Sequence, residues 1–374
     1  MTTALNKKSS ALLLEGHQQN SFLHPLWGMQ DIEASAKICN RCGACAQACQ
    51  SYRVLKGEPF SPRGRNQLLR FILQRNFRND IPQKDILNPA VTCIMCGQCT
   101  AACAAFVPTA KHMAAVKRNR GLTCGGFWRG LYLKIFARYP AFFYFFTGLR
   151  RQKPTYVNAF YLPSIQAPQS IALISKKYEH IQIIKSGLYL TETALTQNLP
   201  PLIKTLDNIK AEYEAVLSPE PLPIIADDIE SFRLLKLSAE IDEKYQNLAQ
   251  NAVFIADIIK PQTINKPSKI LIQNNNIFFC DDGAAQKALK LFVCPDGKFL
   301  VEFTLGAQSA GLLPYCNIKG GAQIAENIAA RLAAQKADLL IVLSSADKKF
   351  FNNLLKKYYP YTKVLHITEY FYEN

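Results

Sequence analysis

The sequence lacks the residue patterns with which most enzymes activate a substrate. Its five histidines are scattered, and none is at metal-ligand spacing from another histidine or a carboxylate. There is no Ser-His-Asp order, no phosphate-binding loop and no Gly-x-Gly-x-x-Gly turn. These absences argue against a complete enzyme and favour a carrier subunit that works with a catalytic partner.

Long hydrophobic runs are also missing. The apolar run 11–14 ends at Glu15 and is too short for a cleavable signal peptide. The apolar run 139–146 is far shorter than the roughly 20 residues of a membrane-spanning helix. We therefore expect a protein of the reducing cytoplasm, where thiols stay free.

Acidic residues are scarce in the first part of the chain. Residues 1–155 hold 22 Lys and Arg against 6 Asp and Glu, whereas residues 156–374 hold 22 of each, so the net charge of +16 lies entirely in the first part. Some of these cations can compensate an anionic cofactor nearby. The others suit anionic lipid or an acidic protein. Nucleic acid is not expected, because no nucleic-acid-binding motif accompanies the charge.

Cysteine, in contrast, is abundant and regularly spaced. Eight of the 12 cysteines form two copies of the pattern Cys-x2-Cys-x2-Cys-x3-Cys. The copies are Cys39, Cys42, Cys45 and Cys49, and then Cys93, Cys96, Cys99 and Cys103. Three thiolates at this spacing can bind one [4Fe–4S] cluster, while the fourth points away and reaches the other cluster.

The spacing therefore predicts two [4Fe–4S] clusters that exchange one ligand. The expected ligands are Cys39, Cys42, Cys45 and Cys103 for the first cluster, and Cys93, Cys96, Cys99 and Cys49 for the second. Gly43 and Gly97 let the backbone pass close to the inorganic sulfides. The alternative is two structural zinc sites, although zinc cysteines usually come in pairs separated by a longer loop. The pattern predicts electron transfer, without naming the partners.

The pentapeptide 61–65, Ser-Pro-Arg-Gly-Arg, follows the first copy, with Ser61 as the expected N-cap of a helix. Together with the doubled motif it resembles the iron–sulfur subunits of glycolate oxidase and of the related lactate-utilisation (heterodisulfide-reductase-related) proteins, over about residues 35–115. The resemblance implies a subunit that passes electrons from a flavin-containing 2-hydroxy-acid dehydrogenase towards the respiratory chain. That family usually has proline after the fourth cysteine, where this sequence has Gln50 and Ala104. We expect cluster binding to survive this change.

Residues 127–148 form a second unusual stretch, with ten aromatic residues flanked and interrupted by Arg and Lys. A basic, aromatic helical segment can lie in the interface of an anionic membrane. The alternative is a buried helix pair that packs on the cluster domain. Both interpretations stay open at this point.

The C-terminal part contains a weak internal repeat. Residues 152–169 hold three prolines and are expected to form a linker, after which Ile-Lys-Ser-Gly at 184–187 matches Ile-Lys-Gly-Gly at 318–321, at an offset of 134. Each copy continues with a helix-like run and apolar segments. The expected strands are 213–218 and 253–255 in the first copy, and 339–344 and 364–367 in the second. The pattern predicts a pseudo-symmetric tandem of two α/β units.

This layout also resembles the C-terminal half of the same family, which is a tandem of cysteine-rich repeats. Here only Cys316 remains of the repeat cysteines. Because a metal site needs about four protein ligands, no third cluster is expected. Four cysteines are expected to be ordinary isolated thiols: Cys124, Cys280, Cys294 and Cys316.

The predicted fold class is α+β, with an N-terminal helical di-cluster ferredoxin-type domain followed by the pseudo-symmetric tandem α/β domain. The expected boundaries are an N-terminal extension at 1–30, a double 4Fe-4S ferredoxin-type domain at 31–120, an aromatic and basic helical segment at 121–155, and the tandem at 170–374 (about 170–262 and 268–374). Two other functions remain open: an electron-transfer subunit of another dehydrogenase, such as the anaerobic glycerol-3-phosphate system, and a non-catalytic assembly protein. The expected location is the cytoplasm, with peripheral attachment to the inner face of the cell membrane as an option.

Overall fold

The computed structural model describes the two cysteine motifs with most of their surroundings, and most of the C-terminal half of the chain. The described residues are 35–73, 88–119, 156–164, 167–190, 199–216, 218, 220–264, 269–273, 283–293, 300–303, 313, 318 and 320–373. The predicted N-terminal extension, the segment 121–155 and the four cysteines outside the motifs lie outside these residues. Within them, no helix is both long enough and apolar enough to span a membrane.

The N-terminal part is helical. Its elements are α3 (Ala44–Ala48), α4 (Gln50–Leu55), η1 (Glu58–Phe60), α5 (Pro62–Leu73), α7 (Gln98–Ala101) and α8 (Thr109–Asn119). The predicted start of α5 is confirmed, because Pro62 is its first residue and the Ser61 hydroxyl accepts a hydrogen bond of 2.9 Å from the Gly64 N–H. We call residues 35–119 the cluster domain.

Two α/β units follow. The first unit contains β1 (Ala159–Leu162), α11 (Ala167–Ile174), β2 (Ile181–Ile183), η2 (Lys185–Tyr189), α13 (Leu199–Glu214), β3 (Ile224–Ala226), α14 (Ile229–Ile241), η3 (Glu243–Tyr245), α15 (Gln246–Asn251), β4 (Ala252–Phe254) and η4 (Ile255–Asp257). The second unit contains β6 (Lys269–Gln273), α16 (Ala284–Lys290), β8 (Leu300–Phe303), α17 (Gly321–Ala333), β9 (Leu339–Val342), α18 (Ser345–Tyr358), β10 (Lys363–His366) and α19 (Ile367–Glu373). A short parallel pair, β5 (Gln262–Thr263) and β7 (Phe292–Val293), accompanies them.

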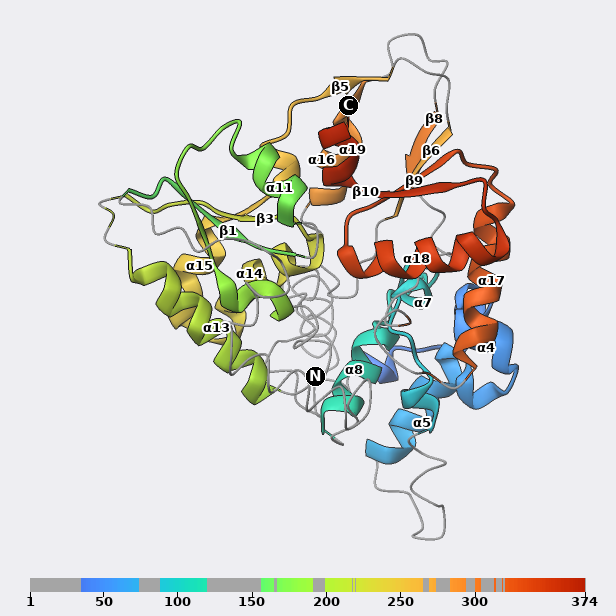
Figure 1. Ribbon diagram of the computed structural model, residues 1–374. Helices are drawn as coiled ribbons and strands as arrows, with labels where there is room; N and C mark the ends of the chain where they lie inside the picture. Colours follow the sequence, from blue (N-terminus) through green and yellow to red (C-terminus); the bar gives the residue numbers. More distant parts are fainter. Residues whose placement is uncertain are drawn as a thin grey trace.

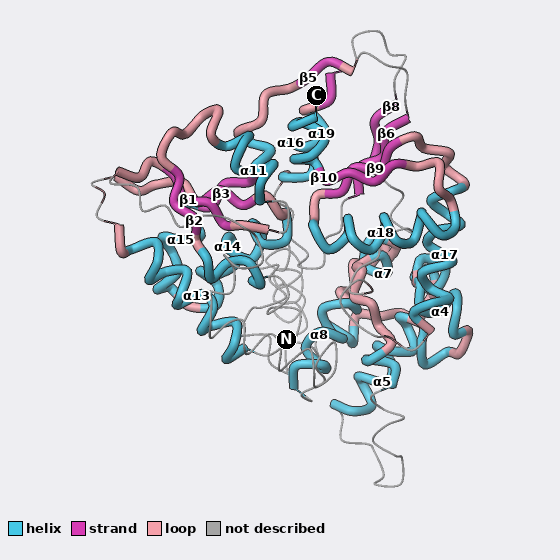
Figure 2. The backbone as a smooth tube through the Cα atoms, viewed as in Figure 1, coloured by secondary structure: helices cyan, strands magenta, loops and turns pink. Residues whose placement is uncertain are grey.

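The two units have the same topology. The first sheet has the order β2-β1-β3-β4 and the second the order β8-β6-β9-β10, and all strand pairs are parallel. In each sheet the second strand along the chain (β2 or β8) is an edge strand beside the first (β1 or β6). The chain then crosses over, and the remaining two strands are added on the other side of the first strand. As a result, α13 and α14 lie on one face of the first sheet and α11 lies on the other. In the same way, α17 and α18 lie on one face of the second sheet, and α16 and α19 lie on the opposite face (Figures 1 and 2). The predicted tandem of α/β units is therefore present.

Three details of the sequence interpretation are wrong. The predicted linker contains the fully buried strand β1, whose Ala-Phe-Tyr-Leu sequence is apolar throughout because helices cover both faces of the sheet. Residues 213–216 belong to the end of α13 and the turn after it, and the strand expected there is β3, at Ile224–Ala226. Since β3 corresponds to β9, the units repeat at an offset nearer 115 residues than 134. The strands predicted near 253–255, 339–344 and 364–367 are confirmed as β4, β9 and β10.

One carboxylate joins the two units. Asp228 is the N-cap of α14, where its Oδ1 accepts hydrogen bonds from the N–H groups of Glu230 (2.9 Å) and Ser231 (3.3 Å). Its Oδ2 accepts a hydrogen bond of 2.9 Å from the Ser345 N–H at the start of α18. Two helix N-termini thus share a single negative charge. Burial raises the pKa of Asp228, and these N–H donors oppose that increase.

A second buried carboxylate, that of Asp227, lies at the edge of the first sheet where the strands end. Asp227 follows β3, and its Oδ2 accepts hydrogen bonds from the hydroxyls of Tyr161 (2.6 Å), Ser164 (2.9 Å) and Ser170. Burial raises the pKa of Asp227 to about 6, although these hydrogen bonds counteract the increase. Open α/β sheets usually bind ligands at this point, between the strands where the order reverses. In the first unit the position is taken by the protein's own hydroxyl groups.

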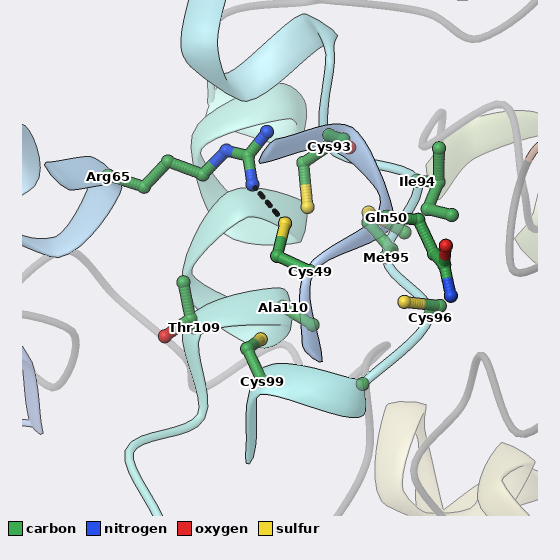
Figure 3. Close-up of a pocket in the computed structure, with 12 residues that line it drawn as sticks. Cys49, Gln50, Arg65, Cys93, Ile94, Met95, Cys96, Cys99, Thr109 and Ala110 are labelled. Atoms are coloured by element: carbon green, nitrogen blue, oxygen red, sulfur yellow. Dashed lines mark hydrogen bonds between the residues drawn. The ribbon is translucent and has the colours of Figure 1, made fainter. Parts of the chain in front are cut away.

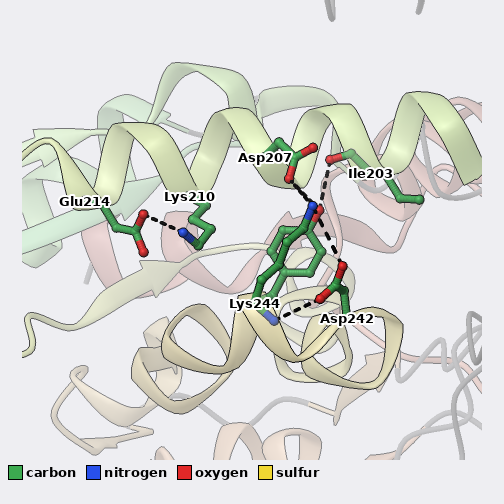
Figure 4. Close-up of polar contacts among 7 residues, drawn as sticks. Ile203, Asp207, Lys210, Glu214, Asp242 and Lys244 are labelled. Atoms are coloured by element: carbon green, nitrogen blue, oxygen red, sulfur yellow. Dashed lines mark hydrogen bonds and ion pairs between the residues drawn. The ribbon is translucent and has the colours of Figure 1, made fainter.

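Polar contacts also hold α13 against η3 (Figure 4). The Tyr245 hydroxyl donates to Asp207 Oδ1 at 2.8 Å, and Lys244 Nζ lies 2.8 Å from the same oxygen. Burial would raise the pKa of Asp207, but the hydrogen bonds from Lys244 and Tyr245 hold it below its usual value. These exposed contacts position the helix and add little to stability.

The cluster domain packs on the second unit. Helix α4 contacts α17, and both lie next to each other in Figure 1. At the start of α17, Gly320 has a φ of +75°, and a Cβ there would lie 3.2 Å from Leu55 Cδ2 and 3.6 Å from Val54 Cγ1. The turn that begins α17 therefore comes close to α4, which directly follows the first cysteine motif.

A buried histidine ties the cluster domain together. His112 in α8 is fully buried, with Nδ1 2.8 Å from Asn66 Oδ1 and Nε2 2.9 Å from Ser35 Oγ. Asn66 Nδ2 donates to Thr109 Oγ1, so Asn66 Oδ1 faces the histidine and Nδ1 carries the proton. Burial, followed by the charge of Lys111, lowers the pKa of His112 to about 3.

This histidine makes stability depend on pH. The pKa of His112 is about 6.5 in the unfolded chain, so the unfolded state binds more protons between pH 6.5 and 3, and folding stability falls as the pH falls. Between pH 7 and 5 the loss should be about 2 kcal/mol, and the buried His366, whose pKa is also lowered to about 3, adds to it. The free energy of unfolding, measured with denaturant at pH 7 and at pH 5, should differ less between the two pH values in His112→Gln than in the wild type. The exposed His180→Gln should keep the wild-type difference; an unchanged difference in His112→Gln would rule out His112 as its source.

Candidate iron–sulfur centre

The two cysteine motifs fold into the same backbone shape. The residue before the second cysteine has a positive φ in both copies, +63° at Arg41 and +54° at Met95. The glycine after that cysteine is also left-handed, with φ +84° at Gly43 and +73° at Gly97, and starts a short helix, α3 or α7. Non-glycine residues adopt this conformation at a cost, which is common at functional sites. Both loops therefore present their thiols in the same way.

The structure groups one cysteine of the first motif with three of the second. Cys49, Cys93, Cys96 and Cys99 line one small cavity between α4, α7 and α8 (Figure 3). Cys49 is brought there because its motif ends in the N-cap of α4, where its Sγ accepts from the Tyr52 N–H. This is the grouping that the spacing predicts for the second cluster. Ligation itself stays a prediction.

The other set lies nearer the surface. Burial, followed by the charges of the neighbouring Cys103 and Cys39, raises the pKa of Cys45 to about 11, so these three thiols are close together. Cys42 is exposed, whereas Cys49, Cys93 and Cys99 of the other set are at most 9% exposed. We call Cys39, Cys42, Cys45 and Cys103 the outer set, and Cys49, Cys93, Cys96 and Cys99 the inner set.

Two thiols of the inner set, Cys96 and Cys99, are held in the protonated form when no metal is bound. Burial raises the pKa of Cys96 to about 12 and that of Cys99 well above its usual value. Iron binds the thiolate, so cluster assembly at this set must release protons. Among the described residues, no three Cys, His, Asp or Glu side chains gather around a single point as they would for one metal ion.

A buried guanidinium faces the inner set. Arg65 is 2% exposed, and its Nη1 donates to Cys49 Sγ at 3.4 Å. Its other hydrogen bonds go to the carbonyl of Pro89 (2.9 Å) and the hydroxyl of Thr92 (3.4 Å). Burial would lower the pKa of Arg65, but the nearby Cys93, Cys49 and Cys99 raise it overall. A guanidinium cannot lose its charge in a protein, and an anionic cluster is the counter-charge that fits it.

Each residue of the pentapeptide 61–65 has a structural role. Ser61 caps α5 and Pro62 starts it, and Arg63 pairs with Glu58 at 2.7 Å. Gly64 is required by space, because a Cβ there would lie 2.0 Å from the Glu58 carbonyl oxygen. Arg65 then enters the core beside Cys49. The sequence singled out the motif, but not the contact between Arg65 and the inner set.

An amide without partners lies at the same cavity. Gln50 is fully buried, and neither its Nε2 nor its Oε1 has a hydrogen-bond partner among the residues that the structure describes. Its side chain lines the cavity on the Cys96 side (Figure 3). A buried amide that lacks partners costs about 1–3 kcal/mol, so a sulfur acceptor at this place would stabilise it. Four thiols, a buried cation and a spare donor are a set that fits an iron–sulfur cluster.

The comparison with known families agrees with this geometry. Residues 35–107 match the family described as the 4Fe-4S dicluster domain. This part of the chain is a ferredoxin-type dicluster domain. The match indicates iron–sulfur binding and suggests a role in electron transfer. No curated protein and no solved structure is significantly similar to the chain.

Proposed function

We propose that the protein is an electron-transfer subunit that carries two [4Fe–4S] clusters, one on each set of cysteines. The observation that carries the proposal is that seven of the eight motif cysteines fall into two groups, each with one cysteine from the other motif. The groups are Cys39, Cys45 and Cys103, and Cys49, Cys93, Cys96 and Cys99. Each cluster exchanges one electron at a time. The cluster itself supplies the redox chemistry, while Arg65, Gln50 and the positive-φ loops hold and surround it.

The proposed donor is a flavin-linked dehydrogenase of a 2-hydroxy acid such as glycolate or lactate, and the acceptor is the respiratory chain. The resemblance over about residues 35–115 supports this assignment. The basic and aromatic segment 127–151 supports peripheral attachment to an anionic membrane surface as part of the same proposal. The anaerobic glycerol-3-phosphate system is the second candidate, because the resemblance rests on a module that both systems share.

The tandem α/β domain is proposed to be an assembly platform for this complex. Two observations favour that role: the carboxyl edge of the first sheet is filled by hydroxyl groups around Asp227, and Asp228 locks the two units together. A protein that only assembles its partners would use the same platform. The presence or absence of redox-active clusters separates the two.

The deciding experiment is anaerobic purification with iron, sulfide, zinc and flavin measured in one sample. We expect about eight iron and eight sulfide per chain, with broad charge-transfer absorption that bleaches on reduction. Co-purification of a flavoprotein would identify the donor, and the acid that reduces the clusters through it would identify the substrate. Stoichiometric zinc with no visible absorption would refute the cluster proposal.

A further inference from the structure

We propose that the inner cluster has the higher reduction potential, so that electrons arrive at the outer cluster and collect at the inner one. The order is set by Arg65, Lys117 and Gln50, which surround the inner set. This inference rests on the proposed presence of both clusters. The electron comes from the reduced flavin of the donor, and each transfer oxidises the outer cluster by one electron and reduces the inner cluster by one.

The first reason is the charge of Arg65. Its guanidinium is buried and lies 3.4 Å from Cys49 Sγ, and its hydrogen bonds to described residues reach a thiol, a carbonyl and a hydroxyl, none of them a carboxylate. Reduction adds one negative charge to a cluster that is already anionic. A permanent cation in contact with one of its ligands stabilises the reduced form and raises the potential.

A second buried cation lies beside the same set. Lys117 in α8 is 1% exposed, and its Nζ donates to the Cys93 carbonyl at 2.8 Å. This bond orients the backbone of an inner cysteine and places another positive charge behind it. Burial of the cluster by itself disfavours the reduced, more negative form. The same low dielectric strengthens the attraction to Arg65 and Lys117, which therefore counteracts that effect.

The third reason is the amide of Gln50. This residue follows Cys49 directly, and its unpartnered Nε2 lies at the cavity on the Cys96 side. An N–H donor aimed at a ligand sulfur or a bridging sulfide withdraws negative charge from the cluster and raises its potential. Proline could not provide this donor, so the glutamine adds a hydrogen bond that a proline at the same position would lack.

Among the described residues, no fully buried cation donates to a cysteine of the outer set as Arg65 and Lys117 do to the inner set. One cation near the outer set is Arg63, whose Nη1 would lie 2.9 Å from a Cβ at Gly43. Arg63 is 40% exposed and paired with Glu58 at 2.7 Å, so its charge is offset by a carboxylate and screened by water. The residue after Cys103 is the exposed Ala104, which has no side-chain donor. The outer cluster therefore keeps the lower potential, and its expected ligand Cys42 is exposed at the surface.

The test is an anaerobic redox titration of the full chain, monitored by electron paramagnetic resonance with dithionite as reductant. Cys96→Ala and Cys42→Ala each leave one cluster and so identify the signals of the outer and the inner cluster. In the wild type we expect the inner signal to appear first. Gln50→Leu should shift the inner midpoint to lower potential and leave the outer one in place, while the exposed Gln47→Leu should shift neither.

Two further variants separate charge from packing. Arg65→Gln should lower the midpoint potential of the inner cluster more than Arg65→Lys, which keeps the charge. If Arg65→Gln does not load the inner cluster, the inference is tested by the order in which the wild-type clusters are reduced and by the inner midpoint potential of Gln50→Leu. Reduction of the outer cluster first, or a Gln50→Leu protein whose inner midpoint equals that of the wild type, would overturn the inference while the clusters remain. A chain without iron and sulfide would instead overturn the proposed function itself.

Discussion

Cys49→Ala should remove the inner cluster and leave the outer one, although Cys49 belongs to the first motif in the sequence. Cys49 lies at the cavity with Cys93, Cys96 and Cys99, whereas Cys45 is close to Cys103 and Cys39. Loss of one thiolate removes a corner ligand in a site where water cannot easily replace it. Iron should fall from about eight to about four per chain.

The comparison between variants makes this result specific. The residual spectrum of Cys49→Ala should equal that of Cys96→Ala, and the spectrum of Cys103→Ala should equal that of Cys42→Ala. A sequential arrangement, in which each motif holds its own cluster, predicts the opposite pairing: Cys49→Ala would then match Cys42→Ala. Iron and sulfide analysis, together with electron paramagnetic resonance of the reduced proteins, distinguishes the two outcomes.

Gly64→Ala should destabilise the cluster domain by about 3 kcal/mol or more and prevent stable loading of the inner cluster. An added Cβ would lie 2.0 Å from the Glu58 carbonyl oxygen and 2.8 Å from its carbon, and backbone atoms cannot move aside as the end of a side chain can. The first turn of α5 would have to shift, and Arg65, the next residue, would move away from Cys49.

The matched control is Gly321→Ala, at the first position of α17. The nearest atom to a Cβ there is Leu313 Cδ1 at 3.4 Å, which is an ordinary contact. Its effect should lie within about 0.5 kcal/mol. Thermal unfolding and iron content of both variants test the prediction, and a Gly64→Ala protein with wild-type stability and eight iron would show that the α5 turn relaxes without cost.

The cysteine spacing alone was sufficient to predict the candidate site. Regular intervals of three residues place thiols on one tight loop, and the odd fourth cysteine must point elsewhere; both are local consequences of chain geometry. The same holds for the start of α5 at Pro62, because capping depends on neighbouring residues. The later strands β9 and β10 were also found, since a strand buried on both faces is an uninterrupted apolar run.

Tertiary structure decided what depends on residues far apart in the sequence. Arg65 and Lys117 both look like solvated cations in the sequence, and only packing of α5 and α8 around the loops places them against Cys49 and Cys93. Strand β1 was mistaken for a linker because prolines flank it, while its parallel neighbours β2 and β3 supply the pairing that makes it a central strand. Local patterns determined which residues can bind clusters, whereas long-range packing determined how buried each set is and which charges surround it.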